Sequence, residues 1–358
     1  MKVKGISYKT IWFDPTKECI KIIDQSVLPH RFRVIDLESL DDIVFAISSM
    51  QVRGAPLIGC AGAYGVYLAT REFKDKESLI DACDRLIDAR PTAVNLEWGV
   101  KKVLKKMFST NNHEEWETIA LDEAKRIAHD DETNCKLIGK FGYDVIKNIQ
   151  PINNETINIL THCNAGWLAT VDWGTATAPM YYSHHRGIDI HVWVDETRPR
   201  MQGALLTSYE LNNESIKNTV ISDNTGGHLM VNNMVDICIT GADRVMSNGD
   251  VINKIGTYEK AVLAFENNIP FYVAIPCSTI DTSSKSASEV IIENRSDKEM
   301  THVSGVYDDD YINIQLYHED SNALNIAFDV TPHKYITGII TETGICDPNK
   351  ESLSKFMK

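Results

Sequence analysis

The sequence predicts an α/β protein with an N-terminal, mainly helical domain, preceded by a small β-flap, and a C-terminal Rossmann-like domain with a doubly wound parallel sheet. Apolar residues recur with helical spacing between about residues 40 and 150, whereas short β-branched runs alternate with helical segments after that. A chain of 358 residues is long enough for two cores. We therefore place the domains at residues 1–150 and 151–358.

The composition restricts the class of partner. The formal net charge is −14, and a nucleic-acid surface needs clustered Lys and Arg, so no nucleic-acid partner is expected. An anionic small molecule remains compatible, because the charge inside a cleft can oppose the net charge. The longest stretch of small and apolar residues, 55–69, is too short to span a membrane and contains three glycines. No membrane association is therefore expected.

The eight cysteines form no Cys-x-x-Cys pair, so the sequence gives no support for a structural zinc site. The first ten residues, MKVKGISYKT, lack the apolar segment of a secretory signal. We therefore expect reduced thiols and a cytoplasmic location. The eleven histidines show no His-Glu-x-x-His spacing, and a catalytic metal is not expected either.

The N-terminal half begins with two alternating segments, YKTIWFD and CIKIIDQ, separated by Pro15 and Thr16, which predict a hairpin. Helical segments follow, among them a small-residue helix that Pro56 opens. The last helical segment, from residue 114 to 146, is too long for one simple helix, and we expect it to bend near Gly139 or Gly142.

In the C-terminal half, five apolar runs are each followed by a polar or glycine-bearing loop: INILTHCNAG, IDIHVWVDETRP, TVISDNTGG, VDICITGADR and FYVAIPCSTID. Such runs are typical of buried parallel strands, and ligands of open α/β sheets bind beyond the carboxyl ends of the strands. The chain has no Gly-x-Gly-x-x-Gly after a strand and no Walker loop, so dinucleotide and nucleoside triphosphate chemistry are not expected.

The segment THCNAG places Cys163 directly after one of these strands. The thiol could be a nucleophile, a metal ligand, an acid or base, or a buried structural group. We expect a helix from about Trp167, whose dipole would favour a thiolate at its N-terminus. Asp243, in ITGADRV, follows another strand at the same edge. It is an acid–base partner of Cys163, a helix cap, or a salt-bridge partner of Arg244.

Two segments suit an anion. Arg53 and Gly54 precede the helix that Pro56 opens, and Arg90 precedes a helix opened by Pro91. Free N–H groups at a helix start together with an arginine can bind a phosphate, although a surface salt bridge would use the same residues.

Polar residues in two further loops could complete such a site. The segment NGDVINKIGTY places Asn253 and Lys254 in a glycine-flanked turn, where Lys254 either holds a phosphate or is solvated. Gln202, in DETRPRMQGALL, could hydrogen-bond sugar hydroxyls or belong to a plain polar loop.

Many of these motifs occur in one order that resembles the methylthioribose-1-phosphate isomerases. The resemblance runs from about residue 50 to 345 and rests on RGAPLIG, RPTAVNL, THCNAGWLAT, DETRPRMQGALLT, SDNTGGHLM, GADRVMSNGDVINKIGTY, YVAIPCSTID and AFDVTPHKYITGIITETGI. The superfamily also includes regulatory subunits of a translation-initiation guanine-exchange factor and the ribose-1,5-bisphosphate isomerases. Those relatives lack the full set of Cys, Asp and Asn-Lys.

The resemblance implies a cytoplasmic homodimer of the methionine salvage pathway that isomerises 5-methylthioribose 1-phosphate, an aldose, to the ketose 5-methylthioribulose 1-phosphate, with no metal or organic cofactor. Carried over by motif, Cys163 and Asp243 are the catalytic pair. The residues implied to hold the substrate are Arg53, Gly54, Ala55, Arg90, Gln202, Asn253 and Lys254.

The implied chemistry needs an acid, because a phosphate on the anomeric oxygen prevents spontaneous ring opening. We expect Asp243, kept protonated by an apolar setting, to protonate the ring oxygen. Cys163 would then either remove the proton from the second carbon or stabilise a direct hydride shift to the first. The sequence leaves both routes open.

Some positions depart from the family pattern. Trp167 stands where a small residue is usual, and Arg200 and Leu205 also differ. A Trp167 that pointed into the pocket would reduce the space for the methylthio group, which would favour 5-deoxyribose 1-phosphate as the substrate; otherwise Trp167 packs behind the loop. A non-catalytic regulatory subunit is the alternative from another class, and the presence of both Cys163 and Asp243 speaks against it.

Overall fold

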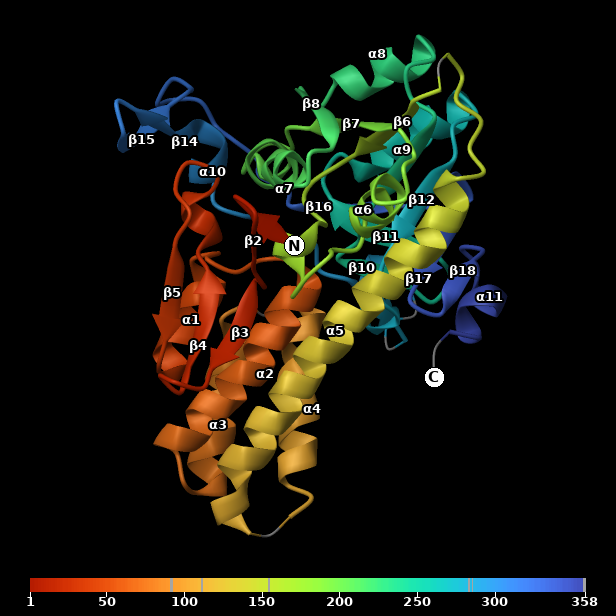
Figure 1. Ribbon diagram of the computed structural model, residues 1–358. Coiled ribbons are helices and arrows are strands. Elements are labelled where there is room, and N and C mark those ends of the chain that lie inside the picture. Colours follow the sequence, from red (N-terminus) through yellow and green to blue (C-terminus); the bar gives the residue numbers. More distant parts are fainter. Residues whose placement is uncertain (91–92, 111, 154, 283, 285, 357–358) are drawn as a thin grey trace.

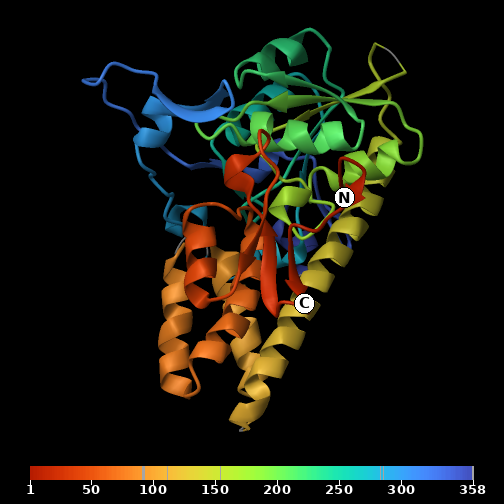
Figure 2. The same ribbon diagram turned by 60° about the vertical axis from the view of Figure 1, so that its left-hand side comes forward.

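The computed structural model describes residues 1–358 apart from 91–92, 111, 154, 283, 285 and 357–358. The helices of the N-terminal half lie below the main sheet of the C-terminal half, and α5 (Trp116–Ile146) runs from one half into the other (Figures 1 and 2). Among the described residues, no helix is both long and apolar enough to cross a membrane.

The predicted β-flap is present. Strands β3 (Ile11–Asp14) and β4 (Cys19–Ile23) form the expected antiparallel hairpin, and β5 (Val34–Leu37) adds to β4. A separate short pair, β1 (Lys2–Val3) and β2 (Ile6–Ser7), precedes them. The flap packs its apolar side against the helices, because Ile11, Ile20 and Ile22 belong to the same core as the helical domain.

The helical domain is built around α2 (Ala55–Glu72), which is buried from Leu57 to Thr70. A helix that is apolar on all sides belongs in the centre of a bundle. The helices that surround it are α1 (Leu40–Ser48), α3 (Lys76–Asp88), α4 (Val94–Met107) and the first half of α5.

The long helical segment is not divided as expected, because α5 is one uninterrupted helix of 31 residues. Its glycines have another function. A Cβ atom at Gly142 would lie 2.3 Å from Cγ of Pro179, and one at Gly139 would lie 3.0 Å from the carbonyl oxygen of Ala178. Both neighbours start α6 (Ala178–His184), so the glycines let α6 pack closely on α5. This helix therefore connects the two halves, and the domain boundary near residue 150 stays a prediction.

The main sheet confirms the predicted fold class. Its parallel strands are β6 (Ile157–Thr161), β7 (Ile190–Asp195), β8 (Lys217–Ile221), β9 (Ile237–Thr240), β12 (Phe271–Ala274) and β17 (Gly338–Thr341), and β18 (Gly344–Cys346) is an antiparallel edge strand. All five predicted strands are among them. The strands lie side by side in the order β8-β7-β6-β9-β12-β17-β18. From β6 the chain adds strands first on one side and then, from β9, on the other side. In such sheets the binding crevice lies at the carboxyl ends of the two strands where this change occurs, here β6 and β9.

Helices cover both faces of the main sheet. The end of α5, α6 and α7 (Ser208–Asn213) share a core with Ile159 and Ile237 on one face. On the other face, α8 (Thr225–Val231), α9 (Thr257–Glu266) and α11 (Lys350–Ser354) share a core with Leu160 and Cys238. Since neighbouring strand residues point to opposite faces, this alternation is the doubly wound arrangement.

A second sheet lies beside the carboxyl end of β9. Its order is β13 (Ile280–Asp281), β10 (Arg244–Met246), β11 (Val251–Lys254) and β16 (Phe328–Thr331). Beyond α10 (Lys298–Thr301), the hairpin of β14 (His302–Tyr307) and β15 (Asp310–Gln315) projects from the body of the protein (Figure 1). It touches the N-terminal half where the Tyr311 hydroxyl donates to the carbonyl of Val27 at 2.5 Å.

Candidate active site

Cys163 lies just beyond β6 in a left-handed backbone conformation, with φ 66°. Such a φ is uncommon outside glycine, and strained residues of this kind gather at functional sites. Two threonines hold the conformation. The Cys163 N–H donates to Oγ1 of Thr197 at 2.9 Å, and the Oγ1 hydroxyl of Thr207 donates to the Cys163 carbonyl at 2.8 Å. Cys163 is half-buried, and hydrogen bonds to both its N–H and its carbonyl fix the backbone that orients the thiol.

The predicted helix after Cys163 is wrong. Trp167–Ala169 form a single 3₁₀ turn, and the next α-helix, α6, begins only at Ala178. Tertiary hydrogen bonds replace the helical ones: Oγ1 of Thr10 donates to the Trp167 carbonyl at 2.9 Å, and Nε2 of Gln25 donates to the Leu168 carbonyl at 2.7 Å. The expected helix dipole from a helix that starts at Trp167 therefore does not act on the thiol.

Asp243 lies three residues beyond β9 and reaches the same place as Cys163. Both line a cavity of about 40 Å³, together with Arg53, Gly54, Ala55 and Asn253. Cys163 and Asp243 therefore line one cavity at the same sheet edge, and their role as a catalytic pair stays a prediction. Arg244 turns away, since its guanidinium donates to Asp281 at 2.8 Å.

The start of α2 forms one wall of this cavity. The helix begins at Ala55 with Pro56 in its first turn, as predicted, and Gly54 caps it with φ 96°. A Cβ atom at Gly54 would lie 2.6 Å from Ala169, so glycine is needed to bring this segment against the loop that follows Cys163. The Arg53 guanidinium is aimed across the cavity at Asn164.

Arg90 lines a neighbouring cavity of about 50 Å³ with Gly54, Ala55 and Asp243. Burial, with repulsion from Arg295, lowers the pKa of Arg90 to about 10. The helix predicted to follow Arg90 starts later than expected, because α4 begins at Val94. Pro91, expected at its first position, lies outside the described residues.

Asn253 and Lys254 do not lie in a turn, as predicted, but in β11, where they pair with Asp329 and Phe328 of β16. Both side chains are buried. The Lys254 ammonium donates to the carbonyl of Ala327 at 2.8 Å. Burial lowers the pKa of Lys254 to about 8, while the attraction of Cys163 and Asp243 opposes this shift. The lysine charge is therefore within electrostatic range of both proposed catalytic groups.

The apolar setting that we predicted for Asp243 is present only in part. Ile58, Ile252 and Phe328 line the cavity beside it, but Arg90 and Lys254 lie within electrostatic range of Asp243. That Asp243 is held protonated stays a prediction.

Gln202 is brought near the site but not into the small cavity. It is buried and lines a larger cavity of about 320 Å³, which Arg53 also borders. Its Oε1 atom has no hydrogen-bond partner within the part of the chain that the structure describes. Arg53 therefore connects the cavity beside Cys163 with the one beside Gln202.

Sequence reasoning missed Arg295. Its side chain is buried, pairs with Glu293 at 3.0 Å, and adds positive charge that lowers the pKa of both Arg90 and Lys254. It comes from the segment ENRSDKEM, which has no periodic pattern or motif that could have pointed to a site.

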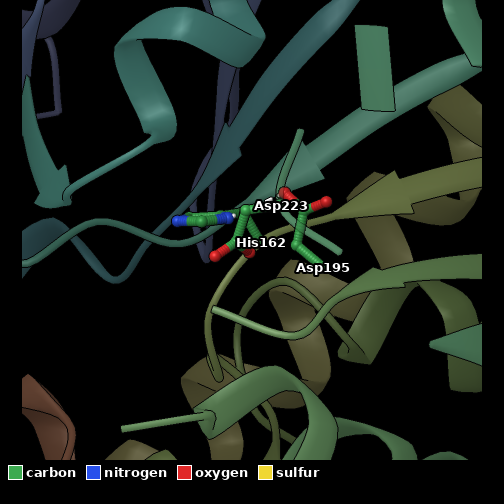
Figure 3. Close-up of side chains that lie close together, drawn as sticks. All are labelled: His162, Asp195 and Asp223. Carbon is green, nitrogen blue, oxygen red and sulfur yellow. Dashed lines mark hydrogen bonds and ion pairs between the residues drawn. The ribbon is translucent and has the colours of Figure 1, made fainter. Parts of the chain in front are cut away.

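His162, Asp195 and Asp223 lie close enough together to suggest a metal site, and Figure 3 shows them at the strand ends. Most of their polar atoms are already engaged, although Oδ1 of Asp195 is buried without a hydrogen-bond partner among the described residues. The His162 ring is 2.8 Å from Asp195 through Nδ1 and 2.8 Å from the Ile255 carbonyl through Nε2. The Lys260 ammonium lies 3.3 Å from Asp195 and supplies the positive charge that a metal would bring. The cluster is best described as a hydrogen-bonded charge network, and the prediction that no metal takes part stays a prediction.

Trp167 is fully buried and belongs to the core that contains Leu168 and Tyr181. It lines neither the cavity beside Cys163 nor the one beside Arg90. The alternative in which Trp167 packs behind the loop is therefore confirmed.

Together, the fold and the site define a doubly wound α/β protein with a thiol, a carboxylate and several buried cations at the point where the strand order reverses. The chain belongs to the initiation factor 2 subunit family, whose model matches residues 51–348.

Similar proteins include a methylthioribose-1-phosphate isomerase of Desulfatibacillum aliphaticivorans, 48% identical over 99% of this chain and 98% of its own length. A protein of the same name from Methylocella silvestris is 49% identical, again over 99% and 98% of the two chains.

Two solved structures are 37% identical to this chain. One is a 5-methylthioribose 1-phosphate isomerase from Pyrococcus horikoshii OT3, with a TM-score of 0.84 over 98% of this chain and 96% of that one. The other is described as translation initiation factor eIF-2B, subunit delta, from A. fulgidus, with a TM-score of 0.81 over 98% and 99%.

Proposed function

We propose that the protein is an aldose–ketose isomerase that converts 5-methylthioribose 1-phosphate to 5-methylthioribulose 1-phosphate in methionine salvage. The observation that carries the proposal is the meeting of Cys163 and Asp243 at one cavity, where Arg53 and the buried Lys254 supply positive charge. Isomerases of this name match the chain over 99% of its length, which supports the substrate.

The cations would hold the phosphate. Arg53 and Arg90 approach from the helical domain and Lys254 from β11, so the anion would bind between the two halves of the protein. The N–H groups of Gly54 and Ala55 at the start of α2 could add hydrogen bonds. Asn253 and the unpartnered Gln202 oxygen are suited to sugar hydroxyls.

The reaction would start with Asp243, which protonates the ring oxygen so that the ring opens although the anomeric oxygen carries phosphate. Cys163 then either takes the proton from the second carbon, after which a proton is added to the first, or stabilises a hydride that moves directly from the second carbon to the first. In both routes the substrate is its own oxidant and reductant, because the second carbon is oxidised while the first is reduced.

The test is turnover of 5-methylthioribose 1-phosphate by the purified protein, measured as formation of the ketose. Activity that Cys163→Ser and Asp243→Asn each remove would support the proposal. The absence of turnover in the folded wild-type protein would contradict it and favour a non-catalytic subunit; the A. fulgidus structure is described as a translation initiation factor subunit.

The alternative substrate, 5-deoxyribose 1-phosphate, loses its main support because Trp167 is packed in the core. A comparison of kcat/KM for the two sugar phosphates decides between them. The homodimer and the cytoplasmic location stay predictions, for which light scattering of the purified protein and localisation of a tagged chain are the tests.

A further inference from the structure

The residue after the thiol, Asn164, holds the Arg53 guanidinium. Nη1 of Arg53 donates to the Asn164 side-chain oxygen at 2.5 Å, and Nη2 donates to the Asn164 backbone carbonyl at 2.9 Å. A guanidinium has five N–H groups, so this fork uses two of them and leaves three for a ligand. Arg53 borders both the cavity beside Cys163 and the cavity beside Gln202. The orientation of the guanidinium therefore decides into which cavity its remaining N–H groups point.

Asn164 orients Arg53 without neutralising it. Both acceptors are neutral carbonyl oxygens, whereas a carboxylate in their place would cancel the charge that an anion needs. An amide fixes the guanidinium in direction and keeps its positive charge for the ligand.

The other end of the amide is fixed by a buried carboxylate on α7. Nδ2 of Asn164 donates to Oε1 of Glu210 at 3.0 Å, and the Leu168 N–H donates to the same oxygen at 2.9 Å. The Tyr181 hydroxyl donates to Oε2 at 3.0 Å. A Cβ atom at Gly166 would lie 1.5 Å from Oε2, so the glycine of THCNAG is what admits the carboxylate behind the loop.

We propose that Glu210 is a positioning residue that acts through Asn164 to orient Arg53 toward the phosphate of the substrate. This inference rests on the proposed function. The carboxylate draws the amide hydrogens toward itself, which increases the negative charge on the amide oxygen and strengthens its bond to the guanidinium. Glu210 has no place in the reaction itself, because Asn164 stands between it and Arg53.

The charge state of Glu210 gives the proposal a signature in pH. Burial raises its pKa to about 7, while the hydrogen bonds of Asn164, Leu168 and Tyr181 and the charge of Arg53 oppose the shift. Of the groups that face it, Tyr181 stays neutral because burial raises its pKa, and Arg53 is the cation that acts on the carboxylate. Glu214 lies four residues farther along the chain, directly after α7. The KM for the sugar phosphate should therefore fall as Glu210 ionises between about pH 6 and 8.

The experiment uses Glu210→Gln, which keeps the shape and an acceptor for Asn164 but removes the charge. The KM for the sugar phosphate and the Kd for inorganic phosphate should each rise about tenfold, with kcat changed less than threefold. In wild type, KM should change between pH 6 and 8 as Glu210 ionises, and in Glu210→Gln this change should be absent. Ionisation of the substrate phosphate affects the KM of both proteins equally and is subtracted first.

Glu214→Gln is the matched control, because it removes another carboxylate from the same segment. The Glu214 carboxylate contacts His185 and does not contact Asn164. It should leave KM within twofold of wild type. Asn164→Ala interrupts the proposed connection, so adding Glu210→Gln to it should cause no further loss of phosphate binding. Should Glu210→Gln not fold, Asn164→Ala alone should remove the pH step.

The inference would be overturned if folded Glu210→Gln had an unchanged KM. It would also be overturned if Glu210→Gln weakened phosphate binding as much in the Asn164→Ala background as in wild type. Neither result would affect the isomerase proposal. If wild type does not turn over the sugar phosphate, the proposed function fails instead. The titrations with inorganic phosphate then still decide whether Glu210 positions Arg53.

Discussion

Replacing Lys254 by methionine should make the protein more stable and nearly inactive. The Lys254 side chain is only 4% exposed, and its ammonium donates to the Ala327 carbonyl at 2.8 Å. Within the part of the chain that the structure describes, no carboxylate lies within 4.0 Å of it. A buried cation with so little compensation should lower the stability of the fold.

The size of this cost follows from the pKa of Lys254, which burial lowers from 10.5 to about 8. The folded state therefore holds the proton less tightly than the unfolded chain. At pH 7 the difference destabilises the fold by about 3 kcal/mol, and losing the hydrogen bond to Ala327 would cost about 1 kcal/mol in the variant. The net gain for Lys254→Met is about 2 kcal/mol, which corresponds to a rise in Tm of about 3 °C for a chain of this length.

The sign of the pH dependence is fixed by the same shift. Because the pKa is lower in the fold, the destabilisation is complete below about pH 8 and disappears as the pH rises toward 10.5. The gap in Tm between Lys254→Met and wild type should therefore shrink over that interval. Above pH 8, wild type should also lose affinity for the sugar phosphate, because Lys254 loses its proton.

Thermal unfolding at pH 7 and pH 10, together with kcat/KM at pH 7, provides the measurement. We expect kcat/KM to fall about a hundredfold or more, since a charge-assisted contact with the phosphate is lost. Methionine at the exposed Lys105 is the control and should change Tm by less than a degree. A variant that is less stable than wild type at pH 7, or a gap that does not depend on pH, would refute the reasoning.

Three further results are expected. Cys163→Ser and Asp243→Asn should each lower kcat by about a thousandfold with Tm within about two degrees of wild type, as measured by product formation and circular dichroism. Product made in deuterated water should carry deuterium at the first carbon if a proton is transferred and none if a hydride moves, which mass spectrometry detects. Trp167→Phe should cost about 1–2 kcal/mol of stability in a thermal or urea melt but leave the ratio of kcat/KM for the methylthio and 5-deoxy sugar phosphates unchanged, because the side chain packs in the core. A changed ratio would place Trp167 at the substrate after all.

Much of the fold could be predicted because its elements have local signals. The five β-branched runs predicted β6, β7, β8, β9 and β12, and a parallel arrangement then brought their carboxyl ends to one edge. The parallel arrangement by itself places Cys163 and Asp243 at the same edge of the sheet. The helix start at Ala55 was equally predictable, because Pro56 and Gly54 have conformational preferences of their own.

The errors occur where distant contacts override local preference. The segment after Cys163 has the composition of a helix start, but its carbonyls bond to Thr10 and Gln25, which are far away in the sequence. Lys254 looked like a turn residue because of its neighbouring glycines, and pairing with β16 made it part of a strand. Glu210 and Arg295 gave no signal, since what matters in each is the burial of a charge, which depends on the tertiary structure.

The hydrogen-bond acceptors of the buried cations distinguish the cations that stabilise the structure from those that are available to bind a ligand. Arg244 and Arg295 lie beside the site but are paired with the carboxylates of Asp281 and Glu293. Arg53 and Lys254 instead donate to neutral oxygens, those of Asn164 and Ala327. A neutral acceptor fixes the direction of a cation without pairing it with a carboxylate, and the burial of Lys254 then destabilises the fold until an anion arrives. The same interactions that lower stability at Lys254 would therefore be recovered as binding energy for a phosphate, which is why stability and affinity should change in opposite directions when that residue is replaced.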